Sequence, residues 1–275
     1  ALLKQAPYSD SASIATDDAS AIIQYGLDNE FLERIEHKLG DVVTTDEKTA
    51  LQMAYVRNNS LHLFILPGLI CSLVMNARSI SIDTLQSMVH LLYPFLRNEY
   101  YLHWQDGDDL SRAVSKTVDV LEKEQLISRE DHCLHGAPIH THESDMLDHL
   151  GQTVMPSLER YYLTIRLLVQ YGSGMLTADQ LGELAHQTAQ RLSLLYEFNS
   201  PEFFDKVVLK NFISQLYGTG LVTTNDAGAL VFDEKLESLD DEARRILSPD
   251  ISDAIQRVTR VTDIEHLVEP ASSAS

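Results

Sequence analysis

Apolar residues recur along most of this chain at steps of three and four positions, the spacing that gathers them on one face of an α-helix. One such stripe begins after Ser81, and a second covers residues 109–126. Small apolar groups separated by polar turn residues follow at 127–139, a pattern that indicates a β-hairpin. The first stripe consists of Ile82, Leu85, Met88, Val89, Leu92 and Leu96. The pattern predicts a mainly α fold, a helical bundle-like domain with two short β-hairpin wings.

The same order of elements is predicted again in the second half of the chain. Helices are expected over residues 155–169, 181–195 and 203–217, followed by a hairpin over residues 221–232. Leu85 and Leu181 lie 96 positions apart, and so do His90 and His186. Because a near-constant offset indicates internal duplication, we predict two repeated helix-helix-helix-hairpin units.

Changes in composition divide the chain into four parts. Residues 1–20 are rich in Ser, Asp and Ala with little apolar periodicity, and residues 269–275 are expected to be disordered. The predicted division is 1–45, a linker with short helices; 46–150, a first helical unit with an apolar helix and a hairpin; 151–232, a second helical unit with a hairpin; and 233–275, acidic C-terminal helices and a disordered tail.

The most apolar stretch covers residues 63–75 and includes Pro67 and Gly68. It is shorter than the roughly 20 residues that a helix needs to cross a bilayer. We therefore predict a buried helix, continuous with a helix that begins at Asp46 and kinked or interrupted at Pro67. An interfacial or re-entrant contact with a membrane is the alternative interpretation.

Composition limits the classes of molecule that this chain is expected to bind. The chain has 275 residues, of which 44% are hydrophobic, enough to bury a core. Its 21 basic and 41 acidic residues give a net charge of −20, which disfavours nucleic acid and a polybasic membrane patch. Winged helix-turn-helix modules share the predicted order of elements, but the third helices here carry too few cations for recognition helices. We expect no nucleic-acid partner.

A cluster of histidines gives a weak signal for metal binding. Five of the eleven histidines lie within the eighteen residues from 132 to 149. The weak candidate ligands are His132, Cys133, His135, His140 and His142. Zinc prefers such groups, but no paired Cys-x-x-Cys element and no His-Glu-x-x-His helix supports a site. We expect a solvated loop here, with no metal and no cofactor.

Two His-x4-Asp pairs, His103/Asp108 and His140/Asp145, have the spacing of a glycerolipid acyltransferase dyad. In such a dyad the carboxylate orients the imidazole that takes the proton of the acceptor hydroxyl. Neither pair is joined by a Gly-rich or Arg-bearing segment for the acceptor phosphate, and the chain contains no Phe-x-Glu-Gly-x-Arg motif. A base without its anion-binding partners cannot assemble the reaction, so we assign no catalytic residue.

A polar segment precedes the apolar helix and contains Arg57, Asn58, Asn59 and His62. These side chains can satisfy buried backbone groups at a structural junction, or they can contact the polar face of another domain. Both interpretations stay open, and the four residues are our candidates for an interdomain contact.

Four strings carry a resemblance to a known family. They run from Tyr55 to Pro67 (YVRNNSLHLFILP), from Leu92 to Leu96 (LYPFL), from Ala189 to Leu195 (AQRLSLL) and from Asn199 to Lys206 (NSPEFFDK). They resemble the C-terminal region of bacterial membrane glycerol-3-phosphate 1-O-acyltransferase, with similarity over residues 6–232.

The resemblance implies a role within a larger enzyme. The whole enzyme is expected to transfer an acyl group from acyl-CoA or acyl-carrier protein to glycerol-3-phosphate, the first step of phospholipid synthesis, at the cytoplasmic face of the bacterial inner membrane. The family's catalytic blocks lie upstream of the matching region. The chain is therefore expected to be an accessory region without activity of its own, with the upstream acyltransferase domain and the membrane surface as partners. The alternative is a stand-alone helical protein-interaction module with winged-helix-like units.

Overall fold

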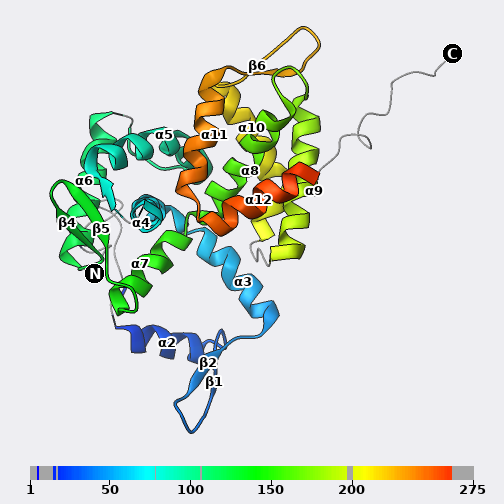
Figure 1. Ribbon diagram of the computed structural model, residues 1–275. Helices are drawn as coiled ribbons and strands as arrows, with labels where there is room; N and C mark the ends of the chain where they lie inside the picture. Colours follow the sequence, from blue (N-terminus) through cyan, green and yellow to red (C-terminus); the bar gives the residue numbers. More distant parts are fainter. Residues whose placement is uncertain are drawn as a thin grey trace.

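The computed structural model describes residues 5, 15–16, 18–77, 79–105, 107–196 and 201–261. Helices dominate these residues, and the few strands form three small antiparallel sheets (Figure 1). The predicted mainly α fold is therefore confirmed. The described residues contain one more hairpin than the two predicted. The predicted disordered tail at 269–275 and most of the linker at 1–20 lie outside the described residues.

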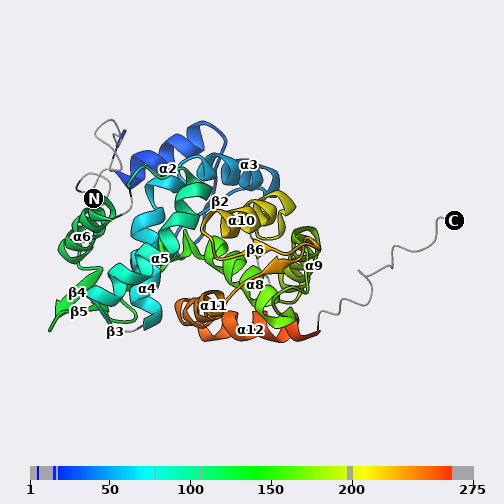
Figure 2. The same cartoon turned by 90° about the horizontal axis from the view of Figure 1, so that it is seen from above.

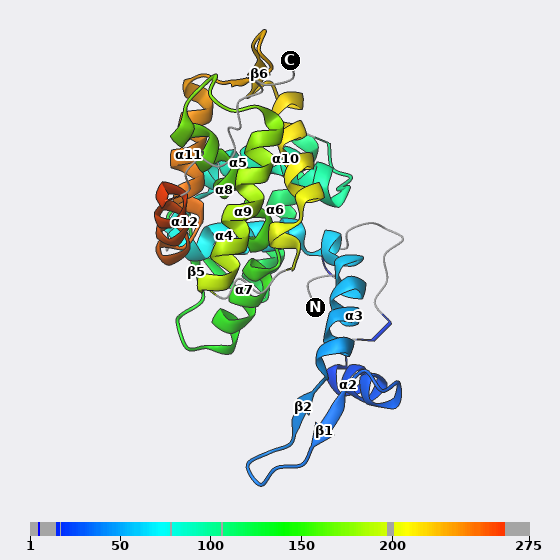
Figure 3. The same cartoon turned by 90° about the vertical axis from the view of Figure 1, so that its right-hand side faces the viewer.

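An arm on the N-terminal side projects from the helical body, as Figure 3 shows. It consists of α2 (Ala19–Asp28), β1 (Glu33–Ile35), β2 (Val42–Thr44) and α3 (Glu47–Asn58). We call residues 19–58 the N-terminal arm. Asp18 and Asp46 cap its two helices by accepting backbone N–H groups of the first turns. The sequence pattern does not predict the hairpin β1–β2 because each strand has only three residues.

The first half of the helical body combines helices with a three-stranded sheet. Its elements are η1 (Leu61–Leu63), α4 (Ile65–Ala77), β3 (Ser79–Ser81), α5 (Ile82–Tyr100), α6 (Asp108–Lys123), β4 (Ile127–Glu130) and β5 (Cys133–Gly136). The hairpin predicted at 127–139 is confirmed as β4–β5, and β3 extends it in the order β3-β5-β4. Ser81 ends β3 and caps α5 by accepting the N–H of Thr84, which ties the sheet to the helix.

The apolar run folds as α4, and the predicted buried helix is confirmed because its residues 65–74 are buried. The predicted interruption at Pro67 is wrong. The predicted continuity with the helix that begins near Asp46 is also wrong, because that helix, α3, ends at Asn58 and η1 separates it from α4. Pro67 lies in the first turn of α4, where its missing N–H costs no helical hydrogen bond. None of the helices that the structure describes combines the length and apolar character needed to cross a membrane.

The second half of the body is also mainly helical. Its elements are α7 (His142–Gln152), α8 (Met155–Tyr171), α9 (Ala178–Tyr196), η2 (Pro201–Phe204), α10 (Lys206–Gly218), β6 (Thr223–Thr224), β7 (Leu230–Val231), α11 (Glu234–Ile246) and α12 (Pro249–Val261). The solvated loop expected over residues 132–149 is wrong from residue 142 onward, because those residues form α7. Thr141 caps this helix by accepting the N–H of Ser144 at 3.1 Å. The second predicted hairpin is confirmed as β6–β7.

One continuous core joins the two halves. α8 lies at the centre of the second half, with α9, α10, α11 and α12 packed around it (Figure 2). Three aromatic rings link α5, α8 and α10. The ring centroids of Phe95 and Tyr161 lie 5.8 Å apart, and Tyr161 stacks on Phe212 at 4.3 Å. The halves are therefore held in a fixed relation by side-chain packing.

Candidate functional site

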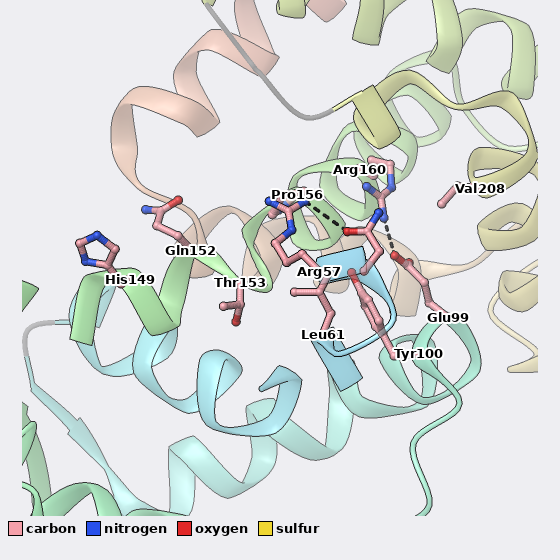
Figure 4. A pocket seen from close by; sticks show the side chains of 11 residues that line it. Arg57, Leu61, Glu99, Tyr100, His149, Gln152, Thr153, Pro156, Arg160 and Val208 are labelled. Atoms are coloured by element: carbon pink, nitrogen blue, oxygen red, sulfur yellow. Dashed lines mark hydrogen bonds and ion pairs between the residues drawn. The ribbon is translucent and has the colours of Figure 1, made fainter. Parts of the chain in front are cut away.

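A polar cavity of about 460 Å³ lies at the root of the N-terminal arm, where α3 meets the helical body (Figure 4). Its lining comes from α3, η1, α5, α7, α8 and α10. The lining residues are Arg57, Asn58, Leu61, Glu99, Tyr100, His149, Gln152, Thr153, Pro156, Arg160 and Val208. We call it the arm-root cavity. The arm and both halves of the body meet at this cavity.

Two of the four interdomain candidates, Arg57 and Asn58, line the arm-root cavity. Arg57 is exposed, and its Nη2 donates to Asn58 Oδ1 at 3.2 Å. Asn59 is exposed, and its backbone N–H donates to the carbonyl oxygen of Val56 at the end of α3. His62 is half-buried on η1 and does not line the cavity. The structure therefore brings two candidates to one site and leaves the other two beside it.

The facing wall of the cavity contains an ion pair between Glu99 of α5 and Arg160 of α8. The Arg160 side chain is 3% exposed, and the Glu99 side chain is 16% exposed. Ser157 Oγ donates to Glu99 Oε1 at 2.7 Å, and Tyr161 Oη donates to Glu99 Oε2 at 2.6 Å. A buried ion pair is stable only when further hydrogen bonds satisfy its remaining polar atoms. Because both Glu99 oxygens accept hydrogen bonds, this carboxylate is held in place and anchors the wall.

Two tyrosine hydroxyl groups lie next to this ion pair: Tyr100 lines the cavity, and Tyr161 donates to Glu99. Burial, together with the nearby negative charge of Glu99, raises the pKa of Tyr100 to about 12. The same two causes raise the pKa of Tyr161 well above its ordinary value. Both hydroxyl groups therefore stay protonated at neutral pH and can donate hydrogen bonds. Tyr100 Oη lies 2.8 Å from Ser157 Oγ, so a chain of polar contacts runs from the cavity to Glu99.

The charge balance of the cavity indicates what it can bind. Glu99 compensates the charge of Arg160, whereas Arg57 forms no ion pair within the described part of the chain. Gln152 and Thr153 add uncharged polar groups to the lining. Guanidinium and amide donors in the lining of this cavity suit a carboxylate or a backbone carbonyl oxygen of a neighbouring polypeptide.

The weak metal candidates lie along one loop, one hairpin and the start of α7. His132 and His140 take positive φ values of 66° and 70° in turns, and His142 opens α7. Cys133 and His135 lie two residues apart on β5. Across the residues that the structure describes, no three His, Cys, Asp or Glu side chains come together as metal ligands.

The two His-x4-Asp pairs have unrelated surroundings. The ring of His103 lies beside that of Trp104, with centroids 4.4 Å apart, and Asp108 is the first residue of α6. His140 precedes α7, and the backbone carbonyl oxygen of Asp145 lies 2.6 Å from Nδ1 of His149. Neither pair lies in the arm-root cavity.

Sequence reasoning missed the Glu99 and Arg160 wall. These residues lie 61 positions apart and belong to no motif, so no local pattern connects them. Sequence reasoning also missed Glu159, which is 7% exposed on α8. The only sequence signal for either is a charged residue within an otherwise apolar helix, which indicates a partner or an unusual environment.

The chain is thus a mainly helical region, and a cavity lined mainly by polar residues lies where its projecting arm meets the two halves of the body. The chain belongs to the glycerol-3-phosphate acyltransferase family, of which it is the C-terminal region, because the family model "Glycerol-3-phosphate acyltransferase C-terminal region" matches residues 1–225. The resemblance carried by the four sequence strings is thereby confirmed.

Curated relatives agree with this assignment. The chain is 33% identical over 259 residues to a glycerol-3-phosphate acyltransferase of Pseudomonas entomophila (strain L48), covering 94% of this chain and 31% of the relative. It is 34% identical over 273 residues to that of Xanthomonas campestris pv. campestris, covering 98% and 31%. It is 34% identical over 277 residues to that of Pseudomonas aeruginosa (strain LESB58), covering 100% and 32%. The chain thus spans about a third of the length of these relatives.

Proposed function

We propose that this chain acts as the accessory C-terminal region of a full-length glycerol-3-phosphate acyltransferase. In this proposal, the upstream domain transfers an acyl group from acyl-CoA or acyl-carrier protein to the sn-1 hydroxyl group of glycerol-3-phosphate and forms lysophosphatidic acid. The observation that carries the proposal is the family match over residues 1–225, in relatives about three times as long. The separate surroundings of the two His-x4-Asp pairs also favour an upstream site for the chemistry.

The proposed task of the chain is to support the upstream domain through the arm-root cavity. Arg57 and Asn58 offer donors at the mouth, and Glu99 and Arg160 hold the wall behind them. Loss of the contact would leave the upstream domain without its support. We therefore expect the cavity to affect acyl transfer by positioning, not by chemistry.

We also propose that the full enzyme works at the cytoplasmic face of the bacterial inner membrane, as its family implies. The net charge of −20 opposes direct attraction of this chain to anionic lipid. The upstream region is therefore the better candidate for the main membrane contact, with this chain held close to the surface through it.

The internal duplication remains part of the proposal. Its support is the order α4, β3, α5, α6 and β4–β5 in one half and α8, α9, α10 and β6–β7 in the other. α5 and α9 begin 96 positions apart, as do β4 and β6. Thr177 precedes α9 and bridges to Ala229, much as β3 precedes α5 and pairs with β5. Helices that fail to coincide when the halves are superposed would contradict duplication.

Acyl transfer to labelled glycerol-3-phosphate tests the proposed function. We expect activity from the full-length enzyme, none from this chain alone, and recovery when the chain is added to a separately expressed upstream region. Arg57→Ala should weaken recovery, whereas Lys116→Ala, an exposed cation on α6 of the helical body, should not. A chain that acylates glycerol-3-phosphate by itself at a rate close to that of the intact enzyme would overturn the proposal.

The stand-alone interaction module is the second candidate. Each of the three relatives described above contains the matching region as about a third of a longer acyltransferase. No feature of the cavity favours the stand-alone role over the accessory role.

A further inference from the structure

Exposed apolar side chains are concentrated in the N-terminal arm. The described residues include eighteen large hydrophobic side chains that are exposed, and eleven of them lie within residues 19–58. They are Ile22, Ile23, Tyr25, Phe31, Ile35, Leu39, Val42, Val43, Leu51, Met53 and Val56. The much larger body exposes the other seven. Concentrated exposure of this kind marks an interaction surface.

The helix α3 exposes apolar side chains on more than one side. Leu51 is 51% exposed, Met53 39% and Val56 69%. Because each residue turns a helix by about 100°, Met53 and Val56 lie on one side of α3 and Leu51 lies on the opposite side. None of the side chains of α3 that the structure describes is buried. A helix with apolar residues on opposite faces is stable when both faces are covered.

The hairpin β1–β2 is equally unsupported. Ile35 pairs with Val42, and Arg34 pairs with Val43, so apolar side chains lie on both faces of a two-stranded sheet. Neither strand pairs with any other described strand. An isolated two-stranded hairpin is marginal in water, and open strand edges readily accept another polypeptide. The hairpin therefore has both an apolar surface and free edges for a partner.

We propose that the N-terminal arm is a docking element whose apolar surfaces are covered by the upstream region of the same polypeptide. This inference rests on the proposed function and adds the surface that makes the contact. In the relatives, about two thirds of the chain lies outside the match, and the matched family region is C-terminal. The rest of the polypeptide therefore precedes the arm in sequence and is tethered beside it.

Charge argues against lipid as the occupant of this surface. Residues 19–58 contain seven acidic and four basic residues, a net charge of −3. An apolar surface that enters an anionic bilayer normally carries Lys and Arg around its apolar face. The arm instead has a mixed acidic border, which suits a protein surface.

Cysteine protection in the full-length enzyme tests the docking surface. Single substitutions Ile35→Cys, Leu51→Cys and Val56→Cys probe the arm, and Leu194→Cys and Met175→Cys probe body positions that are 86% and 65% exposed. Maleimide labelling is followed peptide by peptide with mass spectrometry. We expect the three arm cysteines to react at least about tenfold more slowly than the body cysteines. Arm cysteines that react as fast as the body controls would overturn the proposal.

Photo-crosslinking identifies what covers the arm. A benzophenone amino acid in place of Val56 should link to peptides of the upstream region within one polypeptide. Links between two polypeptides that fade on dilution would assign the surface to a second copy. Protection that appears only on phosphatidylethanolamine and phosphatidylglycerol vesicles would assign it to lipid. Either result would overturn the proposal.

The two tests can fail separately. Intramolecular crosslinks together with full activity of the isolated upstream region would keep the docking surface and remove the supporting role. Reconstituted activity with unprotected arm cysteines would keep the supporting role and remove the docking surface.

Discussion

Arg160 of α8 donates a hydrogen bond to the carboxylate of Glu99 on α5, and this ion pair spans the two halves of the body. It forms the inner wall of the arm-root cavity. The two residues are 61 positions apart, so the ion pair forms only when α5 and α8 have packed together. The geometry of the cavity therefore depends on the same contacts that hold the halves together.

Breaking this ion pair should strongly lower the stability of the folded chain. Arg160→Ala leaves Glu99 partly buried without its cation, and we expect the free energy of unfolding to fall by about 3–5 kcal/mol. The double variant Arg160→Met with Glu99→Gln should lose less than the sum of the losses from the single variants Arg160→Met and Glu99→Gln, because it removes both charges. Urea unfolding of the natural chain, these two single variants and the double variant measures this coupling.

An exposed ion pair provides the control. Arg112 lies 3.5 Å from Asp109, and its side chain is 77% exposed. Arg112→Ala should change the free energy of unfolding by less than about 1 kcal/mol. Equal losses from Arg112→Ala and Arg160→Ala would show that the buried pair has no special role in the wall.

Glu159 should make the stability depend on pH. Burial raises the pKa of this carboxyl group from 4.5 to about 8, opposed by the nearby charge of Arg160. Between these values the folded chain holds a proton that the unfolded chain has lost. Stability should therefore fall as pH rises through this window, by up to about 1.4 kcal/mol per pH unit, and level off above the folded pKa.

Glu159→Gln removes the titrating group and keeps the shape. Its stability relative to the natural chain should grow steadily from pH 5 to pH 8 in urea unfolding. Thr224→Val, at an exposed position on β6 that carries no titratable group, should show a small difference that does not change with pH. A constant difference for Glu159→Gln would mean that Glu159 is ionised in the folded chain throughout.

Periodicity predicted most helices because their buried faces repeat at the helical spacing. It failed where burial is low or an element is short. β1 and β2 have three residues each and expose their apolar side chains, so no alternation marks them. α7 carries histidines and carboxylates in the first turns, which hid its two buried residues, Leu147 and Gly151.

The candidate site was predictable only in part. Arg57 and Asn58 stand out because they precede an apolar helix within one short string. The wall that faces them depends on Glu99 and Arg160, which tertiary packing brings together. No rule of spacing connects two such residues. A polar residue within an apolar stripe signals only that some partner exists.

Close packing of α4 against α7 should make Gly68 intolerant of substitution. A Cβ atom at Gly68 would lie 2.3 Å from Thr153 Oγ1 and 2.7 Å from the backbone oxygen of Leu150. The carbonyl cannot move without shifting α7, so Gly68→Ala should destabilise the chain by about 1–3 kcal/mol. Thermal unfolding followed by circular dichroism measures the loss.

Gly182→Ala is the matched control for this substitution. Its Cβ would meet its nearest neighbour, Lys210 Cγ, at 3.7 Å, which is an ordinary contact. Because Ala favours a helix over Gly, this variant should be neutral or more stable by up to about 1 kcal/mol. A Gly68→Ala chain as stable as Gly182→Ala would contradict the close approach of α4 and α7.

The last two helices should prove essential to the core although the family model ends at residue 225. Ile255 of α12 is 0% exposed, and Gln256 beside it donates to Tyr162 Oη of α8 at 3.0 Å. Ile255→Ala should lower the free energy of unfolding by about 2–5 kcal/mol, because it opens a cavity against α8 and α9. Urea unfolding measures this, and the exposed neighbour Arg257→Ala should change stability by less than about 0.5 kcal/mol. Similar small effects from both variants would mean that α12 is an appendage and that the core is complete without it.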